Sequence, residues 1–140
     1  MSVHKNDQGA GKFQVHEKAR GLAAYTIHIT SNPKIFPPEF NVAITNKINA
    51  VALDIQTSTW TANNIMVKGD NAKELYLERR KYQEQAAVDC NILLSMIDLA
   101  WKVFHLTSKR VRYWSEMTIE VRNLIRVWHN SDTKRYSNYR

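Results

Sequence analysis

The sequence predicts an all-α protein, folded as an antiparallel, up-down-up-down bundle of four helices. Apolar residues recur three and four positions apart in four long stretches, which places each set along one side of a helix. The connectors between these stretches are short, and the first of them holds all three prolines. Short connectors favour antiparallel neighbours. With 140 residues the chain suits one domain, and we expect the bundle over residues 14–130.

The first helix is expected over residues 14–31. Residues 1–13 are polar and lack a period, so we expect them to form a flexible N-terminal tail. Asn32-Pro33 ends the helix, because a residue before proline is pushed out of the helical region. The row of side chains that faces the core is called the seam here. In this helix it consists of Val15, Ala19, Leu22, Thr26 and Ile29.

The second helix is expected over residues 39–67, opened by Pro37 or Pro38, where a missing N–H does no harm. Gly69 is expected to supply a left-handed cap after it. Its seam alternates four and three without a break: Ile44, Ile48, Val51, Ile55, Ser58, Ala62 and Ile65.

The third helix, residues 71–105, is the longest, and Asn71 with Glu74 fits a capping box at its start. Only Arg79 interrupts its seam, and we expect this arginine to be structural, paired to a buried acid or at a subunit contact. Cys90 lies in mid-seam and is expected to be a small core residue. The apolar members are Leu75, Tyr82, Ala86, Cys90, Leu93, Ile97, Ala100 and Phe104.

The fourth helix follows a turn, with Thr107 or Ser108 as its N-cap, and is expected to end near Asn130. If Thr107 is the cap, Leu106 and Val111 form a hydrophobic staple. Residues 131–140 are expected to form a basic, tyrosine-bearing C-terminal tail. The seam contains Val111, Trp114, Met117, Thr118, Val121, Leu124, Ile125 and Trp128.

The net charge of +7 is concentrated towards the C-terminal end of the sequence. Residues 100–140 hold nine Lys or Arg against three acids, whereas residues 1–99 hold eleven against ten. This asymmetry favours a polyanion-binding face, and RNA or DNA is the expected partner. A single cysteine excludes an internal disulfide, and no apolar run reaches the roughly 18 residues of a membrane span. We therefore expect a cytoplasmic protein with no membrane partner.

Basic residues that cluster, or that are locally unfavourable, are the candidates for a nucleic-acid-binding face. Arg122 and Arg126 are like charges four apart, and Lys109 and Arg110 occupy a first helical turn, where the macrodipole disfavours cations. At about 100° per residue, Arg112 shares a sector with Arg122 and Arg126. The alternative is a solvated face, or salt bridges to acids of the third helix. The candidates are Arg80, Lys81, Lys109, Arg110, Arg112, Arg122, Arg126, Lys134 and Arg135.

The four tryptophans are candidates for core residues, interface anchors or base-stacking platforms. Trp101, Trp114 and Trp128 sit on or beside apolar seams, so we expect them in the core. Trp60 lies on the polar side of the second helix and is the better candidate for a subunit interface.

The sequence gives no sign of catalysis. Its five histidines are scattered, with no Cys or carboxylate beside them at metal-ligand spacing, and no nucleophile–base arrangement is recognisable. We therefore expect no catalytic residue, no metal site and no cofactor.

Short motifs in the first two helices resemble a known family. They are Lys18-Ala19-Arg20-Gly21-Leu22-Ala23, Phe36-Pro37 in the first connector and Ala62-Asn63-Asn64. With four helices of this order and a basic surface, the chain resembles the accessory variability determinant (Avd) family over roughly residues 14–130. Members are small partners of reverse transcriptases in diversity-generating retroelements. A sister group of bundle proteins is encoded in intervening sequences of bacterial large-subunit ribosomal RNA genes.

The resemblance implies a homopentameric barrel that binds nucleic acid and engages a reverse transcriptase, supporting mutagenic copying of template RNA. It carries no catalytic motif. The competing hypothesis is a non-catalytic oligomeric scaffold of the sister type, whose positive charge meets an acidic protein partner. Salt dependence of nucleic-acid binding separates the two, because counterion release gives a steep slope only for the first.

Overall fold

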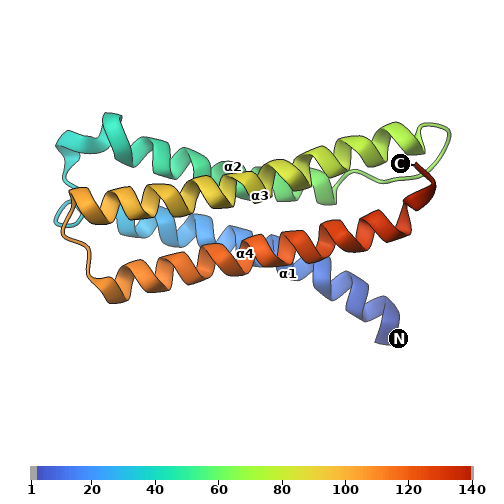
Figure 1. Cartoon of the computed structure of the whole chain (residues 1–140), viewed down its shortest axis with the longest axis horizontal. Helices are drawn as coiled ribbons and strands as arrows, with labels where there is room; N and C mark the ends of the chain where they lie inside the picture. Colours follow the sequence, from blue (N-terminus) through green and yellow to red (C-terminus); the bar gives the residue numbers. More distant parts are fainter. Residues whose placement is uncertain (1–2, 140) are drawn as a thin grey trace.

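The computed structural model describes the backbone of residues 3–139 and the side chains of residues 14–139. Four long helices make up most of this part, and it contains no strand, as expected for a four-helix bundle (Figure 1). The predicted N-terminal tail, residues 1–13, lies outside the residues whose side chains are described. The helices are α1 (Val3–Thr30), α2 (Asn46–Asn63), α3 (Ala72–Val103) and α4 (Ser108–Arg135).

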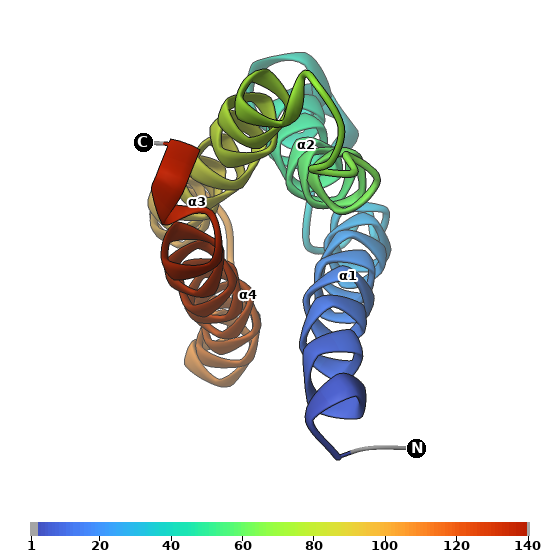
Figure 2. The same cartoon turned by 90° about the vertical axis from the view of Figure 1, so that its right-hand side faces the viewer.

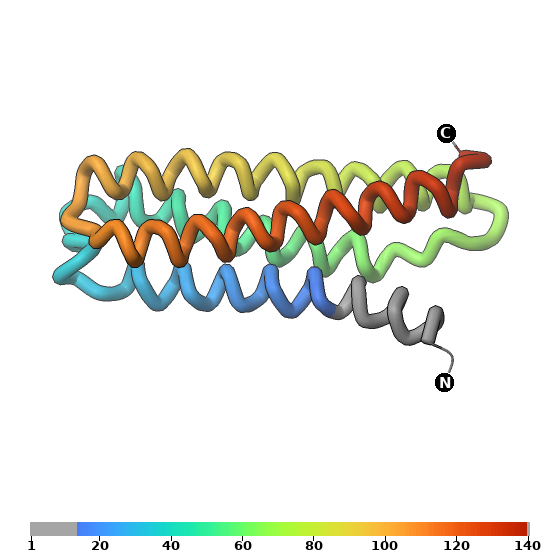
Figure 3. The backbone as a smooth tube through the Cα atoms, turned by 60° about the horizontal axis from the view of Figure 1, so that its bottom comes forward, coloured from blue at the N-terminus to red at the C-terminus, as the bar shows by residue number. Residues whose placement is uncertain are grey.

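The helices follow one another around the bundle, as the end view shows (Figure 2). Helix α1 packs against α2 and α4, and α3 packs against α2 and α4. The α1–α2 and α3–α4 connectors lie at one end, whereas the α2–α3 connector and the C-terminal turn lie at the other (Figure 1). In a side view of the bundle, α4 lies between α1 and α3 (Figure 3). Its two flanks therefore meet different neighbours.

The seam predicted for α1 is confirmed, since all five of its residues are buried. One of them, Thr26, ties α1 to α4 by a hydrogen bond. The Trp114 indole Nε1 donates to Thr26 Oγ1 at 3.0 Å, and that hydroxyl donates to the Leu22 carbonyl at 2.8 Å. A buried tryptophan needs such a partner for its N–H. The core positions predicted for Trp114 and Trp128 are confirmed, at 0% and 7% exposure.

Helix α2 differs from its prediction at both ends. A 3-10 turn, Pro38–Phe40, and a π-helical turn, Asn41–Thr45, precede it. It ends at Asn63 instead of Val67, because Asn64 Nδ2 donates to the Trp60 carbonyl at 2.7 Å and closes the last turn. The predicted seam is also displaced in part. The buried positions are Ile48, Ala52, Ile55, Thr59 and Ala62.

The start of α3 corrects one local prediction. Gly69 has φ of 83°, the left-handed conformation expected of it, but it lies within the α2–α3 connector. Asn71 is the N-cap residue and makes no side-chain capping bond, so the predicted capping box is wrong. Farther along, Arg79 and Cys90 are buried as predicted, at 2% and 0% exposure. Trp101 was expected in the core and is 46% exposed, which corrects that prediction.

Helix α4 begins as predicted and ends later. Thr107 is the N-cap, and its hydroxyl accepts from the Arg110 N–H at 3.1 Å. Leu106 and Val111 are both buried, as a hydrophobic staple requires. The helix continues to Arg135 and is followed by a 3-10 turn, Ser137–Tyr139, so the first half of the predicted tail is helical.

Candidate nucleic-acid interface

Two contacts fix how α3 and α4 lie against each other. Arg79 bonds Asp132, and Arg122 Nη1 donates to Asn91 Oδ1 at 2.9 Å. From the first contact to the second, the position on α3 rises by twelve residues, from 79 to 91, and the position on α4 falls by ten, from 132 to 122. Between these contacts the two helices share one outer side, which we call the α3/α4 face. It comprises Arg80, Glu84, Ala87 and Asn91 of α3 with Arg122, Arg126 and His129 of α4.

A buried ion pair anchors one end of this face. Asp132 accepts from Arg79 Nε at 2.6 Å and Nη2 at 3.1 Å, and from Gln83 Nε2 at 2.8 Å. The side chains of Arg79 and Asp132 are only 2% and 3% exposed. The Arg79 guanidinium also lies 5.2 Å from the centre of the Trp128 ring. Charge partners of this kind hold each other in place, so the last turns of α4 are fixed to α3.

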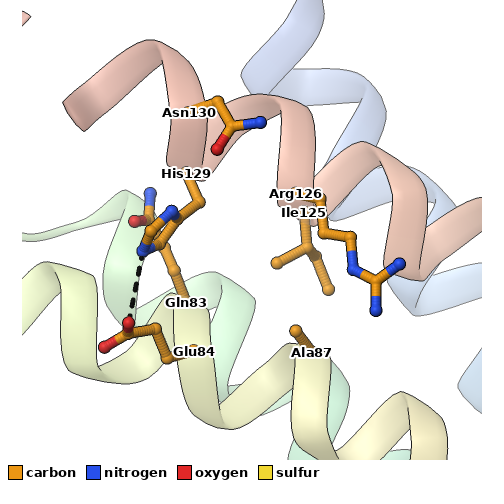
Figure 4. Close-up of a pocket in the computed structure, with 7 residues that line it drawn as sticks. All are labelled: Gln83, Glu84, Ala87, Ile125, Arg126, His129 and Asn130. Carbon is orange, nitrogen blue, oxygen red and sulfur yellow. Dashed lines mark ion pairs between the residues drawn. The ribbon is translucent and has the colours of Figure 1, made fainter. Parts of the chain in front are cut away.

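A cavity of about 290 Å³ opens in the middle of the face (Figure 4). Ala87 and Ile125 face each other across it, and Arg126 projects beside it from α4. Gln83 Oε1 is buried in the wall and has no hydrogen-bond partner among the described side chains. The cavity thus combines apolar walls with a hydrogen-bond acceptor and a cation.

Glu84 is the acidic residue of the α3/α4 face. Its carboxylate lies 3.8 Å from Arg80 Nε and 3.4 Å from His129 Nε2 (Figure 4). The second contact is an ion pair only when the imidazole is protonated. Because Glu84 is 55% exposed, water screens both interactions, and neither holds Arg80 tightly.

Three tyrosines cluster where the face meets the C-terminal turn. Tyr76 is fully buried, and its ring centre lies 5.1 Å from that of Tyr136 and 6.5 Å from that of Tyr139. Tyr136 and Tyr139 are half-buried. Arginines flank the cluster, since Arg80 lies 5.9 Å from the Tyr76 ring centre and Arg135 lies 5.9 Å from that of Tyr136.

The structure brings some of the predicted site residues together and separates others. Arg80, Arg122 and Arg126 line the α3/α4 face, and Arg135 lies at its end, where its guanidinium is 5.9 Å from the centre of the Tyr136 ring. Lys81 and Lys134 are exposed, but adjacent helix residues point about 100° apart, so neither shares the face through its neighbour in sequence. The three arginines of the face come from two helices, and only the register of α3 against α4 makes them one set.

The remaining candidates lie nearer the start of α4. Arg112 is exposed on the same side of the helix, about 15 Å along the axis from Arg122. Lys109 and Arg110 are in the first turn. Arg110 acts on α1, where burial raises the pKa of Tyr25 and the nearby Arg110 charge opposes the rise. We therefore exclude Lys109 and Arg110 from the α3/α4 face.

The sequence prediction missed the tyrosine cluster and His129. The signal was present in the spacing, because positions 122, 126, 129, 133 and 136 follow one another four and three apart. The predicted end of the helix near Asn130 concealed it, since Tyr136 was then placed in a tail.

Metal ligands and a reactive thiol are not found in the described residues. They contain no group of three or more His, Cys, Asp or Glu side chains placed to hold a metal ion. Burial raises the pKa of the Cys90 thiol to about 12, with a further contribution from Asp89, so the thiolate is disfavoured. None of the helices described has the length and apolar character that a membrane crossing requires.

Comparison with protein-family models, with curated proteins and with solved structures found no match for this chain. The resemblance to the Avd family thus rests on the sequence motifs and the helical pattern alone.

Proposed function

We propose that this protein binds RNA or DNA through the α3/α4 face and acts as a non-catalytic accessory subunit of a reverse transcriptase in a diversity-generating retroelement. One observation carries the binding function: Arg80, Arg122 and Arg126 lie along one outer side of two packed helices, and Arg135 stands at its end beside the Tyr136 ring. The identity of the enzyme partner rests on the Avd resemblance.

The charges of this face support the proposal. Glu84 is the one acid described on the α3/α4 face, and it lies near Arg80. The charge of Asp132 is neutralised by Arg79 inside the bundle. Arg126 and Arg135 are exposed, and no acidic side chain among those described lies within ion-pair distance of either. An accessible guanidinium group is suited to phosphate oxygens, because it offers several N–H donors in a planar fork.

Contacts of this kind bind the nucleic-acid backbone and carry no sequence information. The face presents its arginines on the outside of the bundle. We therefore propose binding that depends weakly on sequence, as an accessory factor for copying a template needs.

Assembly is the second part of the proposal. Apolar side chains on the outer side of α3 form a stripe at helical spacing, each between 38% and 51% exposed: Leu77, Val88, Ile92, Leu99 and Val103. Trp60, the candidate for a subunit interface, is 51% exposed, and Val127 on α4 is 66% exposed. Extended apolar surface marks interaction sites. It supports a homo-oligomer of antiparallel, up-down-up-down bundles, and the pentameric barrel follows from the resemblance.

The same stripe favours the competing function, an oligomeric scaffold whose partners are proteins. Under that hypothesis the arginines of the α3/α4 face meet carboxylates of an acidic partner. A nucleic-acid titration with charge-matched variants distinguishes the two, because a scaffold of net charge +7 binds generic RNA or DNA only through its overall charge, whereas a nucleic-acid-binding face depends on its own arginines.

The experiment is an anisotropy titration of generic RNA and DNA against the parent and the double variant Arg122→Glu with Arg126→Glu. We expect the double variant to lose at least tenfold in affinity for both nucleic acids, since two phosphate contacts become repulsive. A second variant tests the opposite sign. Glu84→Gln removes the acid from the face and should tighten binding by a few fold.

The matched control is Lys34→Glu with Lys47→Glu. It makes the same change in net charge at two exposed lysines outside the α3/α4 face. Circular dichroism checks that each variant is folded. Binding that weakened equally in the control would assign the effect to net charge, and the face would lose its role.

A further inference from the structure

We infer that the C-terminal tyrosine cluster, Tyr76 with Tyr136 and Tyr139, stacks unpaired bases, so that the nucleic acid bound on the α3/α4 face is single-stranded. This inference rests on the proposed function and adds the class of nucleic acid to it. It concerns residues that the charge argument does not use.

The cluster consists of one buried ring, Tyr76, and two outer rings, Tyr136 and Tyr139. Tyr76 is fully buried beneath its neighbours. Tyr136 and Tyr139 are half-buried, their ring centres lie 6.3 Å apart, and their planes are inclined by 31°. The outer rings therefore rest on an aromatic support and still present surface to solvent.

The cluster is also tied to the buried ion pair through backbone hydrogen bonds. Tyr136 N–H donates to the Asp132 carbonyl at 2.8 Å, and the Asp132 side chain is bound by Arg79 and Gln83. Tyr139 N–H in turn donates to the Tyr136 carbonyl at 3.0 Å. A platform fixed in this way loses little conformational freedom when a base stacks on it.

Cations stand where the strand's phosphates would lie. Arg80 and Arg135 are each 5.9 Å from a ring of the cluster, and the row continues along the face to Arg126 and Arg122. Aromatic rings beside a basic track are how proteins bind single strands without sequence preference, because every base has a π-face. In a duplex the bases are already stacked on one another, so the rings would gain nothing.

If the cluster only closed the apolar end of the bundle, tyrosines beside arginines would not be required. Leucine or phenylalanine would close the apolar end without a hydroxyl, and the Tyr76 hydroxyl is buried with no hydrogen-bond partner among the described side chains. Two half-exposed rings between arginines are better explained by a ligand with flat, apolar faces and negative charge.

The test compares a labelled oligothymidine single strand with a blunt duplex of equal length, titrated against parent, Tyr139→Leu and Tyr139→Phe. We expect Tyr139→Leu to lose about tenfold in affinity for the single strand and less than about twofold for the duplex. Tyr139→Phe should bind as the parent does, since it keeps the ring. The control is Tyr113→Leu, which removes a tyrosine that is 54% exposed elsewhere on α4.

A second measurement does not depend on any substitution. The parent is crosslinked by ultraviolet light to a single strand that contains 5-iodouracil, and the modified tryptic peptide is identified by mass spectrometry. We expect modification of the peptide that begins at Tyr136, directly after Arg135.

The outcomes separate the two proposals. Equal losses on single strand and duplex, a parent that prefers the duplex, or crosslinks confined to other peptides would overturn the stacking inference and leave the nucleic-acid function standing. A parent that bound neither probe would overturn both.

Discussion

Removing one partner of the buried Arg79–Asp132 pair should unfold this protein more readily than any single surface change. In Asp132→Asn the Arg79 guanidinium, 2% exposed, stays charged and loses the carboxylate that compensates it. Breaking a buried pair from one side costs about 3–5 kcal/mol. With a urea slope of about 2 kcal/mol/M, the unfolding midpoint should fall by roughly 2 M.

The reverse change, Arg79→Met, should cost a similar amount, because Asp132 is then left buried without its partner. Replacing both residues, Arg79→Met with Asp132→Leu, removes the two charges together. What remains is the Gln83 amide without an acceptor, at a cost of about 1–3 kcal/mol. The double variant should therefore be more stable than either single variant.

The assay is urea unfolding followed by circular dichroism at one fixed protein concentration, so that assembly contributes equally to every variant. Two results would refute the reasoning. One is a loss below about 1 kcal/mol in the single variants, which would mean that the pair is open to water. The other is a double variant whose loss equals the sum of the two single losses.

Three further predictions concern other parts of the molecule. Cys90→Ala should cost about 1 kcal/mol or somewhat more by leaving a small cavity, and fast labelling of native Cys90 by a thiol reagent would contradict its burial. Burial raises the pKa of Asp89, so this carboxylate favours folding when protonated and opposes it as pH rises through its folded pKa. Asp89→Asn should accordingly raise the melting temperature at neutral pH and leave it nearly unchanged well below pH 4. A variant less stable than the parent at neutral pH would contradict this prediction and show that the charge of Asp89 is compensated. Light scattering at micromolar concentration should give a mass well above 16.3 kDa, and a monomer mass would refute assembly through the exposed α3 stripe.

Periodicity predicted the α1 seam and the second half of the α3 seam well, because a helix repeats its exposure every three to four residues. At the start of α3 the predicted Leu75 and Tyr82 are half-buried, whereas their neighbours Tyr76 and Gln83 are fully buried. Periodicity was also less accurate for α2, where Val51 and Ser58 are half-buried and Ala52 and Thr59 are fully buried. A stripe of apolar residues marks the inner side of a helix. Which flank of the stripe lies deeper depends on the two neighbouring helices, and the sequence of one helix does not contain that information.

Burial that depends on a distant partner was predicted less well. Asp132 is polar and lies in the expected tail, yet it is buried because Arg79, 53 residues earlier, supplies the opposite charge. The reverse holds for Trp101, which is apolar and beside a seam but remains 46% exposed. Residue type gives an average preference for the interior, whereas the position of each residue is decided by its contacts.

The residues of the candidate site were likewise predictable only in part. Arg122 and Arg126 were predictable from local charge, since like charges four residues apart are costly in a helix without a ligand. Their grouping was not, because Arg80 meets the α4 cations only through the register of α3 against α4. The tyrosine cluster depended further on the true end of α4, five residues beyond the expected one.

The most direct test of the nucleic-acid function is the salt dependence of binding. The affinity of parent and of Arg122→Glu with Arg126→Glu for a generic single strand is measured from low to physiological salt. Four phosphate contacts predict a slope of about −3 in a plot of log affinity against log salt concentration. The double variant should lose about two contacts and flatten the slope by about one to two. A parent slope near zero, or identical slopes for the two proteins, would contradict phosphate binding by the α3/α4 face.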